Sequence, residues 1–330
     1  MTGRMGRALW VILAAWFLTA PAEAADKASL RLEFRLTGFH LPFYWAKEKG
    51  YYAQEGIDLE IKEGAGSPQT VNLMGTNQDT FGFADYTIMA RAIAQGMSVK
   101  GIYGIVQKSP WAVISYQDKA IRKPQDLAGK SLALLAGHKA LMEHFMRINN
   151  VPPESVSLRV VSASVRNTTF AHGTVDSFVS IVIGSPLDFV VLAKEGKGKP
   201  VHFMNFPEFG VDHLAYGILA HHSTLQEKPD LVKRFLRATA KGWTEAPKHV
   251  DEALQIGLKH SPAAKERAES VKLQFLETLP RMRTAATEGK PIGWMSESDW
   301  KNTQDLLVKT GSIEKPLPLG RYYANDFIPQ

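Results

Sequence analysis

A strand, a helix and a second strand follow one another near the N-terminus, and this βαβ unit constrains the fold more than any other feature. Apolar residues at every second position from 32 to 36 predict a strand, which Thr37-Gly38 ends. Pro42 then fits the first turn of a helix, where its missing N–H breaks no hydrogen bond. Alternating apolar residues from 57 to 61 predict the second strand. The loop after the first strand lies at a strand's carboxyl end, where open α/β sheets bind their ligands.

The same alternation continues along the chain and predicts an α/β fold with doubly wound sheets. The predicted strands span 30–36, 58–63, 80–84, 99–106, 111–115, 131–135, 157–161, 177–182, 201–205 and 215–220. The predicted helices span 42–50, 67–74, 88–94, 139–149, 164–172, 186–194, 228–246, 250–259, 263–279 and 297–310. We expect the strands at 111–115 and 215–220 to form a two-strand hinge. Residues 25–115 and 215–330 then make lobe 1 and residues 116–214 make lobe 2, with a ligand in the cleft between them.

The N-terminus has the pattern of an export signal. Two arginines precede an apolar stretch from 8 to 20, and Ala22-Glu23-Ala24 follows. These features are typical of a secretory signal peptide, predicted to span 1–24 with cleavage after Ala24 or Ala25. A membrane anchor is the alternative, but a spanning helix needs about 20 apolar residues. We therefore expect export to the periplasm.

Composition limits the function classes. The chain has no cysteine, so it can hold neither a disulfide nor the lipid tether of a lipoprotein, although an export compartment permits disulfides. Its hydrophobic content of 45% over 330 residues is enough for a large core. The formal net charge is +6, but the basic residues are scattered, and with the export signal this argues against a nucleic-acid partner. A mildly basic surface favours the approach of anionic solutes.

The segment FHLPFYWAKEKGYYAQEGIDLEI, residues 39–61, resembles the solute-binding proteins of ABC importers, and most closely their NMT1/THI5-like group. That group includes binders of thiamine-pyrimidine precursors, sulfonates and nitrate. The resemblance continues in order through residues 64–70, 81–86, 121–130, 173–178 and 323–329. It implies a two-lobed fold like that of type II periplasmic binding proteins. It also implies a monomer that captures a small planar organic solute and delivers it to a permease and ATPase complex in the inner membrane.

The main alternative function is enzymatic. Relatives that make the thiamine pyrimidine use a histidine at the position of His40 together with a cysteine-rich iron motif, and this chain has no cysteine. It also lacks a Walker A loop and the G-x-G-x-x-G, H-E-x-x-H and G-x-S-x-G motifs. No paired spacing of its ten histidines suggests a metal site. We expect no catalytic residue, metal or cofactor, and keep a receptor for a sensor kinase as a third possibility.

In the first lobe, five residues near strand ends are candidates for ligand contact, each with a structural alternative. Phe39 and Tyr86 could cover a planar solute or pack in the core. His40 could hydrogen-bond the solute or be satisfied within its loop. Ser67 precedes Pro68 and fits a helix N-cap, whose free N–H groups could also hold an anion. Asp85 could bind an amino or amidine group, but we favour a capping role.

The second wall of the cleft is expected from the second lobe. Trp111, at the hinge, would complete the aromatic set or pack in the core. Gly137 and His138 follow a predicted strand, in a loop whose backbone N–H groups could form an anion nest. The start of the next helix adds polar candidates. These are Ser164, Asn167 and Thr168. Ordinary turn and capping chemistry is the alternative for all of them.

Overall fold

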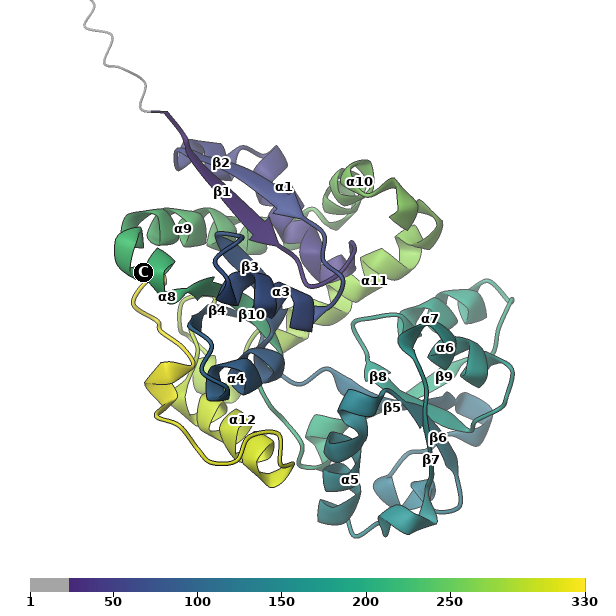
Figure 1. Cartoon of the computed structure of the whole chain (residues 1–330). Helices are drawn as coiled ribbons and strands as arrows, with labels where there is room; N and C mark the ends of the chain where they lie inside the picture. Colours follow the sequence, from purple (N-terminus) through teal and green to yellow (C-terminus); the bar gives the residue numbers. More distant parts are fainter. Residues whose placement is uncertain (1–23, 330) are drawn as a thin grey trace, which may run out of the picture.

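The computed structural model describes residues 24–329 and shows two lobes, each built on a five-stranded sheet with helices on its faces (Figure 1). The predicted signal peptide lies outside the described residues except for Ala24. No helix in residues 24–329 has both the length and the apolar character needed to span a membrane. The predicted α/β class with two sheets is confirmed.

The first sheet has the strand order β2-β1-β3-β10-β4. Its strands are β1 (Asp26–Arg31), β2 (Ile57–Lys62), β3 (Phe81–Asp85), β4 (Val99–Val106) and β10 (Tyr216–His221). β1 runs parallel to β2 and β3, whereas β10 is antiparallel to both β3 and β4. The carboxyl ends of β1 and β3 therefore lie at the same edge of this sheet.

The second sheet repeats this arrangement in the order β7-β6-β8-β5-β9. Its strands are β5 (Trp111–Tyr116), β6 (Ser131–Leu134), β7 (Ser157–Val160), β8 (Ser177–Ile181) and β9 (Val201–Asn205). β6 is parallel to β7 and β8, and β5 is antiparallel to β8 and β9. The carboxyl ends of the three parallel strands share one edge, where the helices that follow them begin.

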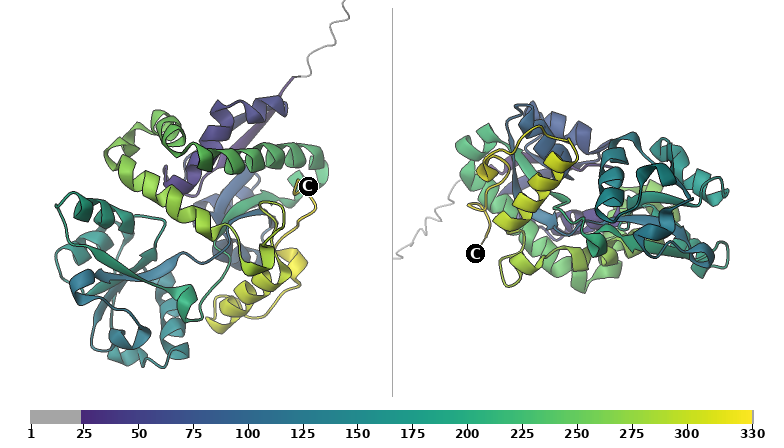
Figure 2. Two further views of the ribbon diagram at one scale, coloured as in Figure 1. Left: turned by 180° about the vertical axis from the view of Figure 1, so that it is seen from behind. Right: turned by 90° about the horizontal axis from the view of Figure 1, so that it is seen from below.

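Helices cover both sheets. Those of the second lobe are α5 (Lys139–Ile148), α6 (Ala163–Ala171) and α7 (Pro186–Lys194). Those of the first lobe are α1 (Leu41–Glu48), α2 (Tyr51–Gln54), α3 (Ser67–Gly75), α4 (Tyr86–Ala94), α8 (His222–Glu227), α9 (Pro229–Glu245), α10 (Val250–His260), α11 (Ala268–Thr278) and α12 (Glu297–Lys309). Figure 2 shows from behind that the C-terminal helices pack on the first lobe. Pro42 lies in the first turn of α1, as predicted.

The chain passes between the sheets twice, at residues 107–110 and 206–215. β5 forms its ladder with β8 and β9, with Trp111 opposite Ile181, so it belongs to the second lobe and not to the first as predicted. The strand begins directly after the first connection, because Ser109-Pro110 interrupts regular pairing. β5 and β10 are interior strands of their sheets, and the connections themselves, not these strands, join the lobes.

The first strand also differs from its prediction. It spans Asp26–Arg31 and not 30–36, although apolar alternation continues to Leu36. The later residues form a loop tied by backbone bonds to the turn at 63–66, including Gly66 N–H to Glu33 O at 2.6 Å. Leu32 and Leu36 are buried by this loop, whereas Phe34 is 45% exposed. The apolar alternation from 32 to 36 therefore belongs to a loop that packs on the core, and not to a strand.

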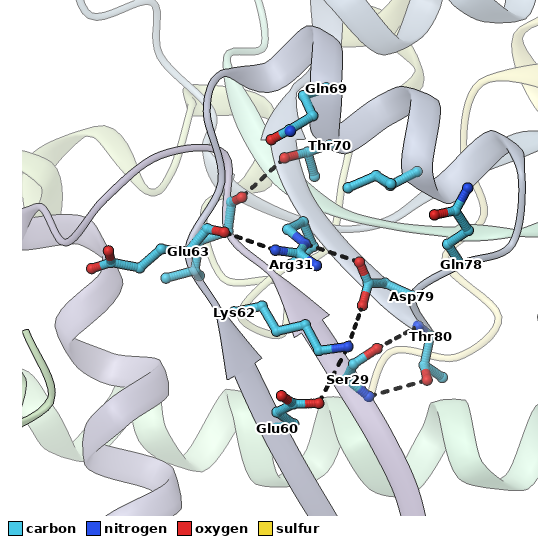
Figure 3. Close-up of polar contacts among 12 residues, drawn as sticks. Ser29, Arg31, Glu60, Lys62, Glu63, Gln69, Thr70, Gln78, Asp79 and Thr80 are labelled. Atoms are coloured by element: carbon cyan, nitrogen blue, oxygen red, sulfur yellow. Dashed lines mark hydrogen bonds and ion pairs between the residues drawn. The ribbon is translucent and has the colours of Figure 1, made fainter.

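A network of charged groups ties β1, β2 and the start of β3 together (Figure 3). The buried carboxylate of Asp79 accepts from Arg31 Nε at 2.9 Å and from Lys62 Nζ at 3.0 Å. Burial alone would raise the pKa of Asp79, but hydrogen bonds from these two cations outweigh it and lower that pKa. Ser29 and Thr80 exchange two hydrogen bonds beside it. This network ties the neighbouring strands of the sheet together.

The two lobes are in contact through apolar side chains. One cluster of buried residues includes Phe39 and Tyr216 of the first lobe together with Phe178 and Ile183 of the second. α11 lies between the lobes, packed on the turn that contains Phe39 and on α7. The two lobes therefore touch each other along α11 and this apolar cluster.

Candidate functional site

A cavity lies between the lobes, where the start of α4 and part of α12 face the turn before α5. The cavity has a volume of about 80 Å³, within about 550 Å³ of free space that includes open solvent. The first lobe contributes Asp85 and Arg91 to its wall, and the second lobe contributes Trp111, Gly137 and His138. Four of the eleven predicted site residues therefore meet in one cavity.

The second-lobe wall follows from the end of β6. The 3-10 turn Ala136–His138 comes two residues after this strand and brings Gly137 and His138 to the cavity. Trp111, the first residue of β5, packs its ring edgewise against His138 with 4.3 Å between centroids. His138 Nδ1 is buried and has no hydrogen-bond partner in the described part of the chain. A ligand atom in the cavity could supply one.

The electrostatics keep the imidazole of His138 neutral at neutral pH. Burial, together with the positive charges of Arg166 and Arg91, lowers its pKa to about 4. A neutral imidazole has one donor and one acceptor nitrogen, so it can bind either kind of polar group.

The first-lobe wall is set by Asp85, which ends β3 and caps α4. Its Oδ1 accepts from Thr87 N–H at 2.7 Å, from the Thr87 hydroxyl at 2.5 Å and from Ile88 N–H at 3.3 Å. The predicted capping role is confirmed. All three bonds reach Oδ1, which leaves Oδ2 without a hydrogen bond to the described residues. Asp85 can therefore cap α4 and still offer one oxygen to the cavity.

Ser67 supports this wall from behind. Its hydroxyl oxygen accepts from Asp85 N–H at 3.0 Å and so connects α3 to the end of β3. Ser67 is the first helical residue and not the N-cap, because Gly66 occupies that position. Gly66 has φ of 124°, a conformation that favours glycine. Ser67 positions Asp85 and does not line the cavity.

Three predicted residues lie in the core of the first lobe. Phe39 is buried against His40 and Tyr216. His40 is fully buried, and its Nε2 lies 2.5 Å from Glu33 Oε2 while its Nδ1 accepts from Thr37 N–H. These bonds place the ring proton on Nε2, facing Glu33. The structure thus favours the packed or satisfied alternative for these two residues.

Tyr86 is the third of these core residues. It has no exposed surface, and its ring packs on Trp300 with 5.0 Å between centroids. Its hydroxyl lies 2.8 Å from Tyr103 O and 3.1 Å from Ile218 O, between β4 and β10. Its side chain points away from the cavity, so we leave it out of the proposed site.

The start of α6 carries the remaining predicted residues, none of which lines the cavity. Ser164 and Thr168 are exposed, and the Ser164 hydroxyl pairs with that of Ser162 at 2.9 Å. Asn167 Oδ1 accepts from both Nε and Nη2 of Arg166 at 3.2 Å. The polar side chain of Asn167 therefore binds Arg166 and does not face the cavity.

The sequence analysis did not predict a role for Arg166, or for Arg91, which lies in the cavity wall. Arg166 is only 8% exposed, at the edge of the second sheet where α6 begins, and Arg91 projects from α4 into the cavity. Arginine is mostly exposed in proteins, so nothing in the local pattern marks either residue. The one sequence signal that could have indicated these arginines is their position, because each lies in a helix that follows a parallel strand.

Comparison with known proteins identifies the family. Residues 38–253 match the family model described as NMT1/THI5 like. The riboflavin-binding protein RibY of Chloroflexus aurantiacus is 24% identical over 291 residues, 87% of this chain and 82% of that protein. A 4-amino-5-hydroxymethyl-2-methylpyrimidine phosphate synthase of Legionella pneumophila is 21% identical over 94% of this chain and 95% of the relative.

Solved structures agree on the fold. The periplasmic aliphatic sulphonate binding protein SsuA of Escherichia coli superposes with a TM-score of 0.68 at 12% identity, covering 90% of this chain and 97% of that one. The fold is therefore that of the periplasmic binding proteins. Because the family model covers most of the chain, this protein belongs to the NMT1/THI5 like family.

Proposed function

We propose that this protein is the periplasmic solute-binding component of an ABC importer. It captures a small planar organic solute between its lobes and delivers it to a permease and ATPase complex in the inner membrane. The observation that carries the proposal is a cavity whose walls come from two lobes joined by two connections and include polar side chains of both lobes. One relative is named as a riboflavin-binding protein, and one structural neighbour is named as an aliphatic sulphonate binding protein, which supports a binding role.

Binding would act on the equilibrium between open and closed lobes. A solute that touches Asp85 on one wall and His138 on the other gains both contacts only when the lobes are closed. It therefore shifts the population toward the closed form by its difference in affinity for the two forms. The Trp111 ring beside His138 offers an apolar surface to a flat solute.

The enzymatic alternative is supported by the name of the Legionella relative. Two observations favour binding over synthesis. His40 is fully buried and bonded to Glu33, outside the cavity. The chain also has no cysteine with which to form a cysteine-rich iron motif. A sensor-kinase receptor would use the same cavity and would differ only in its membrane partner.

A thermal-shift screen with riboflavin, thiamine-pyrimidine precursors, aromatic acids, sulfonates and nitrate tests the proposal. A solute at a hundred times its Kd should stabilise the protein by about 2.7 kcal/mol. His138→Gln should weaken that effect, whereas His172→Gln, the same change at an exposed position of the same lobe, should not. If no solute stabilises the protein, or if both variants behave alike, the proposal fails.

Export is tested separately. The N-terminal sequence of the protein recovered from a periplasmic extract should begin at Ala25 or Asp26, as expected for a cleaved signal peptide. An intact Met1 in the soluble fraction would contradict a periplasmic location.

A further inference from the structure

Arg166 carries a positive charge inside the protein without an acidic partner. Its guanidinium bonds only to neutral acceptors, namely Val179 O at 3.3 Å, the Ser185 hydroxyl at 3.1 Å and Asn167 Oδ1 at 3.2 Å. Among residues 24–329 no carboxylate forms an ion pair with it. Buried charges are normally paired, because taking a charge out of water is costly. This arginine therefore lacks a counter-charge.

The surroundings add more positive charge. Arg91 reaches the same cavity from the first lobe, and its side chain makes neither an ion pair nor a hydrogen bond to the described residues. Arg166 does not line the cavity, whereas His138 does. The positive charges of Arg166 and Arg91 both act on His138 and lower its pKa. Helices α5, α6 and α7 begin at this edge of the second sheet, and their N-termini contribute positive partial charge.

The acidic groups nearby form no ion pair with either arginine in the described part of the chain. Asp85 brings one carboxylate to the cavity wall, and its Oδ1 accepts three hydrogen bonds at the start of α4. Asp188, in the first turn of α7, has one buried oxygen without a partner and forms no ion pair in the described part of the chain. Arg91 thus lines the cavity from the first lobe, and Arg166, whose charge acts on His138 of the same cavity, is buried in the second lobe. Neither arginine forms an ion pair with a carboxylate of the described residues.

We infer that the solute is an anion, with a carboxylate, sulfonate or phosphate group bound between Arg166 and Arg91. This inference rests on the proposed function and narrows its solute class. The anion supplies the counter-charge that the second lobe lacks, and it reaches both arginines only when the lobes close over it. The unpartnered His138 Nδ1 lies beside this group and can accept from, or when protonated donate to, the same solute. A neutral solute of the same shape leaves both guanidinium groups uncompensated and binds more weakly.

The test uses solute pairs that differ in charge and little in shape. Suitable probes are benzoate and benzamide, benzenesulfonate and benzenesulfonamide, and flavin mononucleotide and riboflavin. Calorimetric titration at constant ionic strength gives Kd for each pair with the wild type, Arg166→Gln, Arg166→Lys and Arg91→Gln. Arg159→Gln is the matched control, because Arg159 is exposed on β7 of the same lobe. Melting of each protein without solute reports on folding.

The anionic member of at least one pair should bind at least tenfold more tightly than its neutral partner. Arg166→Gln and Arg91→Gln should each remove most of that preference, Arg166→Lys should restore part of it, and Arg159→Gln should leave it unchanged. Should Arg166→Gln fail to fold, Arg91→Gln decides the matter, since the side chain of Arg91 makes no contact that holds the fold. Binding that ignores solute charge, or a preference that survives both glutamine variants, overturns the inference and leaves the proposed function standing. If the wild type binds none of the anionic probes, the inference fails, and the wider thermal-shift screen decides the proposed function.

Discussion

Single residues at the cavity divide into those that hold its wall in place and those that offer polar atoms to its interior. Asp85 does both, since one oxygen caps α4 and the other is free, whereas Ser67 acts only by binding the backbone of Asp85. His138 lines the cavity and has a buried nitrogen without a hydrogen-bond partner in the described part of the chain. Phe39, His40 and Tyr86 were good candidates by position and type, yet aromatic and histidine side chains look the same in sequence whether they pack or bind. Only the tertiary structure shows where each of them points.

His138 should make the stability of the protein depend on pH. Its pKa is about 4 in the folded protein and about 6.5 when unfolded, so the unfolded chain takes up the proton first as pH falls. The free energy of unfolding should therefore fall between pH 6.5 and pH 4, by about 3 kcal/mol from this group, and change no further below that. Urea unfolding of the wild type and His138→Gln across this range isolates the contribution. Parallel pH curves for the two proteins would contradict it.

Tyr86 should behave as a core residue. Its hydroxyl donates to the backbone between β4 and β10, so Tyr86→Phe should lower the free energy of unfolding by about 1 kcal/mol, the usual worth of one hydrogen bond. Solute affinity should stay within about twofold, because the side chain does not reach the cavity. Denaturant unfolding and calorimetric titration measure the two quantities. A large loss of affinity at unchanged stability would return Tyr86 to the site.

At the scale of elements, sequence periodicity located the strands and helices well but not the points where they begin and end. The helix at Pro42 and the strand Val99–Val106 follow the predictions, because proline position and apolar runs are local signals. The predicted first strand at 30–36 included a loop whose apolar residues are buried by tertiary contacts. β5 was assigned to the wrong lobe because pairing partners far along the chain, β8 and β9, decide which sheet a strand joins.

The ion network at the edge of the first sheet should contribute substantially to stability. Asp79 is buried and bonds two cations from neighbouring strands, so Asp79→Asn leaves Arg31 and Lys62 without their counter-charge. We expect a loss of about 2–4 kcal/mol in the free energy of unfolding, since breaking one side of a buried pair is costly. Solute affinity should not change, because the network lies outside the cavity. Glu60→Gln, at an exposed partner of Lys62, is the control and should cost less than about 1 kcal/mol.

At the scale of the whole molecule, the cavity and its polar side chains lie where the two lobes meet, so neither lobe could form it alone. Alternating strands and helices, together with the family resemblance, predicted two lobes with a cleft between them and the turn at 136–138 in its wall. Arg91 and Arg166 could not be predicted, because the burial of Arg166 and the place of Arg91 in the cavity wall depend on which surfaces the fold brings together. The proposed function therefore requires that binding of a solute brings the two walls of the cavity together.

A distance measurement across the cavity tests this most directly. The chain has no cysteine, so Arg147→Cys on α5 and Lys309→Cys on α12, both exposed and on opposite lobes, can carry spin labels at two defined sites. Pulsed electron-spin resonance should give a broad distance distribution without solute and a narrower, shorter one when a solute found in the screen is present at saturation. The double variant with His138→Gln should need more solute for the same change. Identical distributions with and without bound solute would contradict the claim that binding closes the lobes.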